Sequence, residues 1–315
     1  MAEPVFVPVA SRPDQRPLLG YAMVTAAATL WAVNGTVSKV ILTSDLSSER
    51  LAEIRSTGAF ALLALVLALA RPESLRLRRK ELPYLVLFGA AGLALVQWFY
   101  FLAIHRLAIG IALLIEYLAP VLVALWARFV LRQPVRKRIW VALTLAVVGL
   151  ALVVELWSGV SLDTVGVGAA LAGACAYALY LLLAEHGVGE RDPVSLVCFG
   201  FLFASIVWAC VQPWWTFPGG VIGAHVSLHG NLSSLHLPVW VLMGWMILLG
   251  TIVPFGLLVG ALRHIPATRA AIVAMLEPVL ATIVAYAWLD ESLTAVQLVG
   301  GAVVLAAIFL AQSAR

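Results

Sequence analysis

Long apolar stretches recur along this chain of 315 residues, and short polar segments separate them. Each stretch approaches the length of about 20 residues that a helix needs to cross the hydrocarbon core of a bilayer. The pattern predicts ten membrane-spanning helices, at residues 19–40, 54–70, 83–104, 107–131, 139–156, 165–185, 193–213, 238–262, 267–289 and 293–311. Residues 1–17 contain four prolines and mixed charge, so they are predicted to form a disordered tail.

The second predicted span has the least regular beginning. Glu53 and Arg55 stand at its start, and Gly58 follows them. Charged residues in this position indicate a first turn at the membrane interface, outside the bilayer core.

The composition supports an all-α membrane protein. Hydrophobic residues make up 63% of the chain and charged residues 11%, whereas soluble domains are about half apolar and a quarter charged. No Gly-x-x-x-x-Gly-Lys phosphate loop and no nucleophile–base motif stands out in the sequence. We therefore predict a membrane protein that does not itself hydrolyse ATP, with no cofactor and no metal, whose partners are the lipid bilayer and a small molecule, and no nucleic acid.

The basic residues predict how the chain is oriented. They gather after the second and fourth predicted spans, as Arg71, Arg76, Arg78, Arg79, Lys80, Arg132, Arg136, Lys137 and Arg138. The segments 157–164, 214–238 and 290–292 contain no lysine or arginine. Because cytoplasmic loops carry the excess of Lys and Arg, both termini are predicted to be cytoplasmic and the protein to be multi-pass in the inner membrane.

An internal repeat relates the two halves of the chain. When Pro120 is laid on Pro278, Ala103 falls on Ala261 and Leu131 on Leu289. The matched spans are the fourth and the ninth, and five spans is an odd number, so they run in opposite directions. This predicts an inverted 5+5 repeat, residues 18–158 and 159–315, with the substrate site between the halves near the midplane.

A carboxylate precedes each of these prolines. Glu116 lies four residues before Pro120, and Glu277 lies one residue before Pro278. Proline removes a backbone hydrogen bond, so both helices are predicted to be weakened there and to act as gates. An intramembrane carboxylate costs about 3 kcal/mol and usually faces a cavity or a partner, which favours substrate or proton binding. The structural alternative is a protonated acid that caps a carbonyl freed by the proline.

Aromatic and amide side chains form the remaining candidate site. Trp31 and Asn34 share one face of the first span, and Tyr177 and Tyr180 fall on the matched positions of the sixth. Aromatic rings with polar tips suit a substrate cavity, but they also occur at helix interfaces and at the membrane boundary. The other predicted substrate-binding residues are Gln97, Trp98 and Tyr100 in the third span and Tyr117 beside Glu116.

Three histidines, His225, His229 and His236, lie in a Gly- and Ser-rich outer segment. The first two have the i, i+4 spacing of metal ligands, which leaves a membrane-bound enzyme as an alternative function. No cysteine or acidic residue lies nearby in the sequence, and a solvated loop is the favoured interpretation.

The ten-span plan, the Ala-x-x-x-(Leu/Ile) start of the fourth and ninth spans and their central prolines resemble the drug/metabolite transporter superfamily, EamA-type branch. Asp290 and Glu291 resemble the acidic end of the ninth helix in that branch, whereas the first half departs, with Arg132 and Gln133. Trp31, Gln97, Trp98 and Tyr100 are similar to residues of the YddG-type aromatic amino acid exporters. The resemblance implies a ten-helix basket with a central cavity that opens to each side in turn.

The predicted function is export of amino acids, aromatic ones (Phe, Trp and Tyr) among them, by alternating access. The alternative within the same superfamily is an exporter of drugs or other metabolites.

Overall fold

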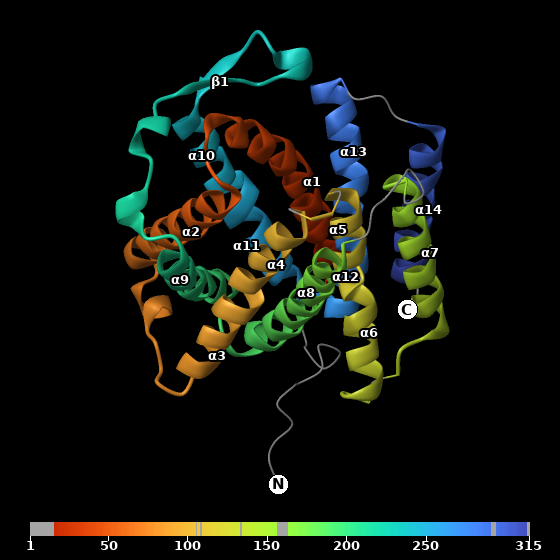
Figure 1. Ribbon diagram of the computed structural model, residues 1–315. Helices are drawn as coiled ribbons and strands as arrows, with labels where there is room; N and C mark the ends of the chain where they lie inside the picture. The colour runs from red at the N-terminus through yellow and green to blue at the C-terminus, as the bar shows by residue number, and fades with distance from the viewer. Residues whose placement is uncertain are drawn as a thin grey trace.

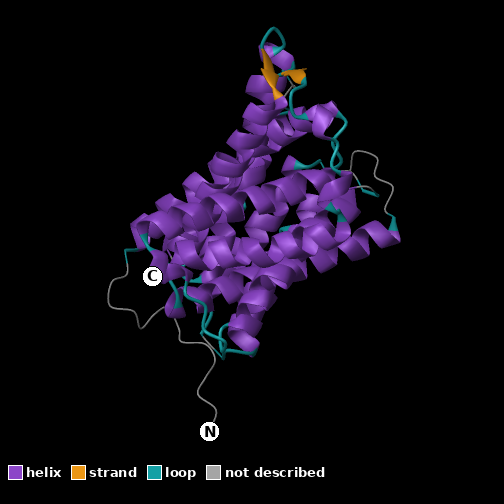
Figure 2. Cartoon of the chain, turned by 90° about the vertical axis from the view of Figure 1, so that its left-hand side faces the viewer, coloured by secondary structure: helices purple, strands orange, loops and turns teal. Residues whose placement is uncertain are grey.

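The computed structural model describes residues 16–104, 106–107, 109–132, 134–155, 163–290 and 294–313. Almost all of this part is helical, and Figures 1 and 2 show the helices packed together, with a small hairpin at one extreme. The predicted tail, apart from its last two residues, and the predicted boundary between the halves at residue 158 lie outside the described residues.

Helices follow one another along the chain, and a two-stranded hairpin interrupts them once. The elements are α1 (Pro17–Ile41), α2 (Ser48–Ala70), α3 (Leu82–Leu87), η4 (Phe88–Ala94), α4 (Leu95–Ile104), α5 (Ile109–Glu116), α6 (Ala119–Phe129), α7 (Lys137–Val153), α8 (Thr164–Glu190), α9 (Pro193–Val211), β1 (His225–Ser227), β2 (His236–Pro238), α10 (Val239–Ile247), η8 (Leu248–Ile252), α11 (Val253–Ala261), α12 (Ala267–Ala274), α13 (Leu276–Leu289) and α14 (Ala295–Ser313). The segments η4 and η8 are π-helical turns inside otherwise continuous helices.

Eight helices in the described part of the chain are long and apolar enough to cross a membrane. They are Pro17–Ser44, Ser48–Ala70, Leu82–Ala103, Ala112–Phe129, Thr164–Glu190, Pro193–Val211, Val239–Ala261 and Ala267–Leu289. The predicted fifth and tenth spans correspond to α7, with 17 residues, and to the shorter apolar helix Ala295–Ala311. That these two also cross the bilayer stays a prediction.

The start of α2 corrects one expectation. Ser47 caps this helix, because its side chain accepts a hydrogen bond from the backbone N–H of Arg50. The helix therefore begins at Ser48, earlier than predicted. Glu53 is fully buried within the protein, and Arg55 is two turns inside the helix, so neither lies in its first turn.

An arginine clamps each end of the packed pair α2 and α9. Arg50, in the first turn of α2, binds Glu53 at 2.6 Å and donates to the carbonyls of Gln212 and Pro213 just after α9. Arg191, just before α9, donates to the carbonyls of Ser74 and Arg76 after α2, and it pairs with Glu81. We call these two arrangements the Arg50 clamp and the Arg191 clamp.

Helices α7 and α14 lie side by side at one edge of the molecule (Figure 1). Their backbones meet at two glycines: a Cβ added at Gly149 would lie 2.9 Å from the carbonyl oxygen of Gly300, and one added at Gly300 would lie 2.7 Å from that of Gly149. No larger residue fits at this contact without moving a helix. Small residues of this kind are what allow membrane helices to approach closely.

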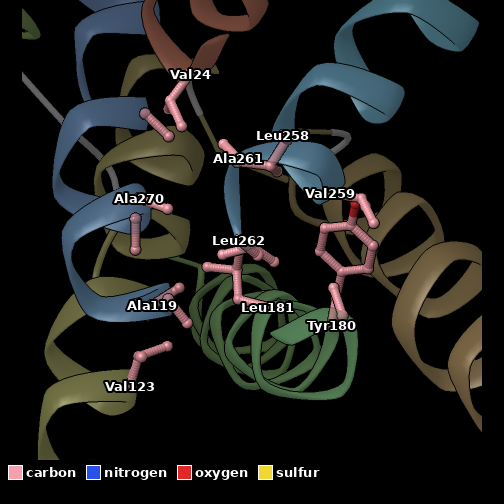
Figure 3. Packing of buried hydrophobic residues seen from close by; sticks show 14 of the residues in the cluster. Val24, Ala119, Val123, Tyr180, Leu181, Leu258, Val259, Ala261, Leu262 and Ala270 are labelled. Atoms are coloured by element: carbon pink, nitrogen blue, oxygen red, sulfur yellow. The ribbon is translucent and has the colours of Figure 1, made fainter. Parts of the chain in front are cut away.

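The main hydrophobic core lies where the two halves meet. Figure 3 shows Val24 of α1, Ala119 of α6 and Leu181 of α8 gathered near residues of α11 and α12, such as Ala261 and Ala270. All five side chains are at most 1% exposed. Because this core contains residues of both predicted repeats, neither repeat has a complete core of its own.

The segment before α10 contains more regular structure than the predicted loop. Strands β1 and β2 pair antiparallel, and the segment that joins them contacts the end of α13. The indole N–H of Trp288 donates to the carbonyl of Leu228 at 2.9 Å, and the amide of Asn231 donates to that of Ala287 at 3.1 Å. Gly230 has φ +51°, and a Cβ there would lie 2.2 Å from the Trp288 carbonyl oxygen, so only glycine fits this approach.

Candidate substrate site

The fourth and ninth predicted spans are both broken in the middle, next to their prolines. Helix α5 ends at Glu116 and α6 resumes at Ala119, while α12 and α13 are separated at Met275. Pro120 and Pro278 each lack the N–H that would continue the helix, so the break follows from local chemistry. The predicted weakening of both helices is therefore present, and their role as gates stays a prediction.

A hydrogen bond joins the two breaks. The hydroxyl of Tyr117, in the first break, donates to Oε2 of Glu277 at 2.7 Å. Glu277 lies in the first turn of α13, where the helix dipole favours a negative charge by about 0.3–1 kcal/mol. Glu116 ends α5 and is close enough to Glu277 for the two carboxylates to repel each other when both are charged. Both carboxyl groups are half-buried.

Arg55 of α2 interacts with one of these carboxylates, that of Glu277, which the sequence analysis did not foresee. Its charge attracts the carboxylate of Glu277 and acts on the side chain of Tyr100. The guanidinium carbon lies 5.9 Å from the ring centroid of Phe255, within the range of a cation–π contact. The N-cap at Ser47 is the sequence signal that could have placed Arg55 inside the span.

Aromatic rings connect these charged groups. Trp31 meets Phe255 edge to face at 5.1 Å, and Phe255 meets Tyr180 at 5.9 Å. Tyr180 stacks on Tyr177 at 6.2 Å, and Tyr177 meets Tyr117 at 6.3 Å. Together with Glu277, which accepts from Tyr117, and Arg55, which lies by Phe255 and acts electrostatically on Glu277, these residues form a connected group that draws on both halves of the chain. We call it the central circuit.

Three of the predicted residues pack instead of facing open space. Asn34 is buried against Gly250, and its side-chain oxygen has no hydrogen-bond partner in the described structure. Gln97 is buried and donates back to the Leu93 carbonyl at 3.2 Å. Tyr180 is 1% exposed, and Figure 3 shows its ring beside Val259 of α11. Asn34 and Gln97 therefore pack between helices, and Tyr180 supports the other rings of the central circuit.

Trp98 lies apart from the central circuit. It is 39% exposed and stacks on Trp208 at 5.9 Å. Both rings line a surface cavity of about 260 Å³, together with Glu49, Phe101, Leu102, Val211 and Gln212. The structure therefore separates Trp98 from Trp31, Tyr100, Glu116, Tyr117, Tyr177 and Glu277, which were predicted with it.

The three outer histidines are exposed. Within the described residues, no group of three or more His, Cys, Asp and Glu side chains could hold a metal ion. The geometry of this segment adds nothing to the alternative of a membrane-bound enzyme.

Paired broken helices, an interior circuit of charged and aromatic groups and many apolar helices define the class of a multi-pass membrane transporter. The sequence profile of the EamA-like transporter family matches the chain twice, over residues 18–155 and 164–312. The chain belongs to this family, a branch of the drug/metabolite transporter superfamily, and it is a membrane exporter of that superfamily.

Similar proteins include amino acid exporters. The threonine/homoserine exporter RhtA of Salmonella typhimurium (strain SL1344) is 30% identical over 245 residues, which cover 77% of this chain and 75% of that protein. RhtA of Escherichia coli (strain K12) is 30% identical over 246 residues, with the same coverage. A solved crystal structure matches 93% of this chain and 96% of its own, with a TM-score of 0.74 and 16% identity, which shows a shared fold alone.

Proposed function

We propose that this chain exports α-amino acids from the cytoplasm by alternating access around Glu116 and Glu277. The observation that carries the proposal is the hydrogen bond between Tyr117 and Glu277. It joins a break in the first family match to a break in the second, and half-buried carboxylates lie on both sides of it. Discontinuous helices that meet at the repeat interface are where transporters of this kind bind substrates.

Matched irregularities support the inverted repeat. The offset that aligns Pro120 with Pro278 also places Tyr117 on Met275, so the two breaks coincide. The same offset places Ala94 on Ile252, the last residues of the π-helical turns η4 and η8. Three features at one offset, namely the prolines, the breaks beside them and the π-helical turns, favour two copies of a single five-helix plan.

Two reciprocal contacts support the same symmetry. The Arg50 clamp joins the start of α2 to the end of α9, and the Arg191 clamp joins the start of α9 to the end of α2. The contact between Gly149 and Gly300 maps, under the proline offset, onto Ala307 and Ala142, and both alanines are fully buried.

We propose that the protein lies in the inner membrane and that both of its termini are in the cytoplasm. The basic residues after α2 and α6 support this orientation through the positive-inside rule. The Arg191 clamp then lies at the cytoplasmic end, because Arg263 contacts Asp192 there and Arg16 contacts His264 beside it. The Arg50 clamp lies at the outer end.

The side chain of the substrate is proposed from two sources. The rings of Trp31, Tyr177 and Phe255 support aromatic amino acids, as does the resemblance to the YddG-type exporters. The names of the RhtA relatives support threonine and homoserine. Both sets of amino acids share the α-amino and α-carboxylate groups. We therefore propose α-amino acids as the substrate class.

Transport by purified protein in liposomes tests this function. Liposomes loaded with threonine, homoserine, phenylalanine, tryptophan or tyrosine are diluted into traces of the same labelled amino acid, and counterflow is measured. At least one amino acid is expected to accumulate above protein-free liposomes. A monodisperse, thermally cooperative protein that moves none of them would reject the proposal, and competition by cationic drugs alone would favour the drug exporter.

A further inference from the structure

Arg55 is a charged side chain inside the apolar helix α2, and it forms no ion pair within the part of the chain that the structure describes. It lies two turns inside α2 and is half-buried, and its Nε is buried with no hydrogen-bond partner in the described structure. An arginine at the centre of a membrane costs about 2.5 kcal/mol or more, so it marks a functional group by default. Phe255 supports its guanidinium from one side.

Arg55 and Glu277 attract each other, but they form no ion pair among the described residues. A purely structural pair would close to direct contact, because bidentate contact is where arginine and carboxylate gain the most. Tyr117 holds Glu277 from the other side, at 2.7 Å, which keeps the carboxylate in place. The two opposite charges therefore act on each other without direct contact.

A free α-amino acid carries two charges that fit this arrangement. Its carboxylate suits the planar guanidinium of Arg55, and its ammonium group suits the carboxylate of Glu277. Its side chain would then point to the rings of Trp31, Phe255 and Tyr177, which line the rest of the circuit. Tyr100 acts electrostatically on Arg55 from the neighbouring helix α4 and contributes to the polar side of the site.

We propose that Arg55 binds the α-carboxylate and Glu277 the α-ammonium group of a zwitterionic amino acid, which bridges the two halves of the transporter. This inference rests on the proposed function and adds the residues that recognise each end of the substrate. Because Arg55 is on α2 and Glu277 on α13, a bound amino acid connects one repeat with the other. Ligands that lack either charge leave one buried group without its partner, so they bind weakly.

Ligand pairs that differ in one charge test the assignment. The probes are L-phenylalanine, its methyl ester and L-phenyllactate, with L-threonine and its methyl ester as a second set, and binding to purified protein is measured by calorimetry and thermal shift. Wild type is expected to prefer the free amino acid over the ester and over the hydroxy acid by about 30-fold or more.

The variants are expected to lose these preferences separately. Arg55→Gln should remove the preference for the free amino acid over its ester, and Glu277→Gln should remove the preference over the hydroxy acid. Arg55→Lys should keep part of the first preference, because the charge remains while the planar fork is lost. Arg128→Gln, a change in an exposed arginine at the end of α6, serves as the matched control and should keep both.

The results distinguish a failure of the Arg55 assignment from a failure of the proposed amino acid export. A folded Arg55→Gln variant that still discriminates against the ester as wild type does would overturn the role of Arg55. If the variants do not fold, the wild type alone decides. Equal affinity for the amino acid and its methyl ester overturns the role of Arg55, whereas a strong preference for the free amino acid supports it. Wild type that neither binds nor transports any amino acid would instead refute the proposed function.

Discussion

The hydroxyl of Tyr117 donates a 2.7 Å hydrogen bond to Oε2 of Glu277, across an interval of 160 residues in the chain. The bond ties the non-helical turn of one broken helix to the first turn of its counterpart in the other repeat. Each break exists because a proline cannot continue its helix. The contact between them is therefore the point where a change in one half reaches the other most directly.

Removing this bond is the first prediction. Tyr117→Phe keeps the ring and its contact with Tyr177 but removes the donor to Glu277. Hydrogen bonds to charged groups contribute about 1.5–3 kcal/mol, so transport is expected to fall by about tenfold or more with little change in expression. Tyr286→Phe, in an exposed position of α13, is the control and should transport like wild type. Equal counterflow rates for the two variants would contradict the prediction.

The Arg50 clamp is expected to contribute more to stability than the Arg191 clamp. Arg50→Gln leaves Glu53, which is 0% exposed, without its charged partner. Breaking a buried pair in this way costs about 3–5 kcal/mol, so the melting temperature in detergent should fall clearly. Arg191→Gln should cost less, because Glu81 is 29% exposed and water can replace its partner. A larger loss of melting temperature in Arg191→Gln would reverse this ranking.

The same two variants should loosen opposite ends of the molecule. Amide hydrogen exchange is expected to rise in residues 71–81 of Arg191→Gln, because the carbonyls of Ser74 and Arg76 lose their donor. In Arg50→Gln the rise is expected in residues 212–217 instead. Each variant is the control for the other, and a rise at both ends in either one would show general unfolding.

The contact between α7 and α14 predicts a steric effect of a single methyl group. In Gly300→Ala the new Cβ would lie 2.7 Å from Gly149, Leu152 and Val153 atoms, so the helices must separate and the melting temperature should fall. Gly244→Ala makes the same change in α10, where nothing lies within 4 Å of the new Cβ. That control should be neutral or slightly stabilising, because alanine favours helix over glycine by about 1 kcal/mol. Equal melting temperatures would show that the glycines are not in close contact.

The outer histidines test the enzyme alternative. His225, His229 and His236 are exposed in the hairpin segment, away from the central circuit. Replacing all three by alanine should leave amino acid counterflow and metal content unchanged. Loss of transport together with loss of a bound metal would instead give these residues a functional role.

Local features of the fold could be predicted from the sequence, because their causes are local. Pro120 and Pro278 interrupt their helices wherever they lie, so the breaks and their alignment were visible without a structure. Apolar runs of suitable length likewise marked most helices of the described chain. The hairpin was not predicted, because its strands have only three residues each and lean on α13.

Which residues form the candidate site depends on contacts between distant segments of the chain. On this point the predictions differed from the structure. Glu53 and Arg55 were placed in the first turn of the second span, although α2 begins earlier, at Ser48, and both residues lie inside it. Asn34 was expected to face a cavity, but Gly250 on the facing helix leaves room for its side chain to pack. Periodicity shows which residues share a helix face, whereas the identity of the opposing helix decides what that face meets.

The two arginine clamps also bear on leakage across the membrane. A passage open at both ends at once would let protons and solutes run down their gradients. The clamps share no residue and lie at opposite ends of α2 and α9, so the free energies of releasing them add. With about 2 kcal/mol for the weaker, Arg191 clamp, a conformer released at both ends is about thirtyfold rarer than one in which the Arg50 clamp alone is released. In the proposed alternating-access cycle, two separate anchors would therefore keep both ends from opening at the same time and would limit the leak of protons and solutes.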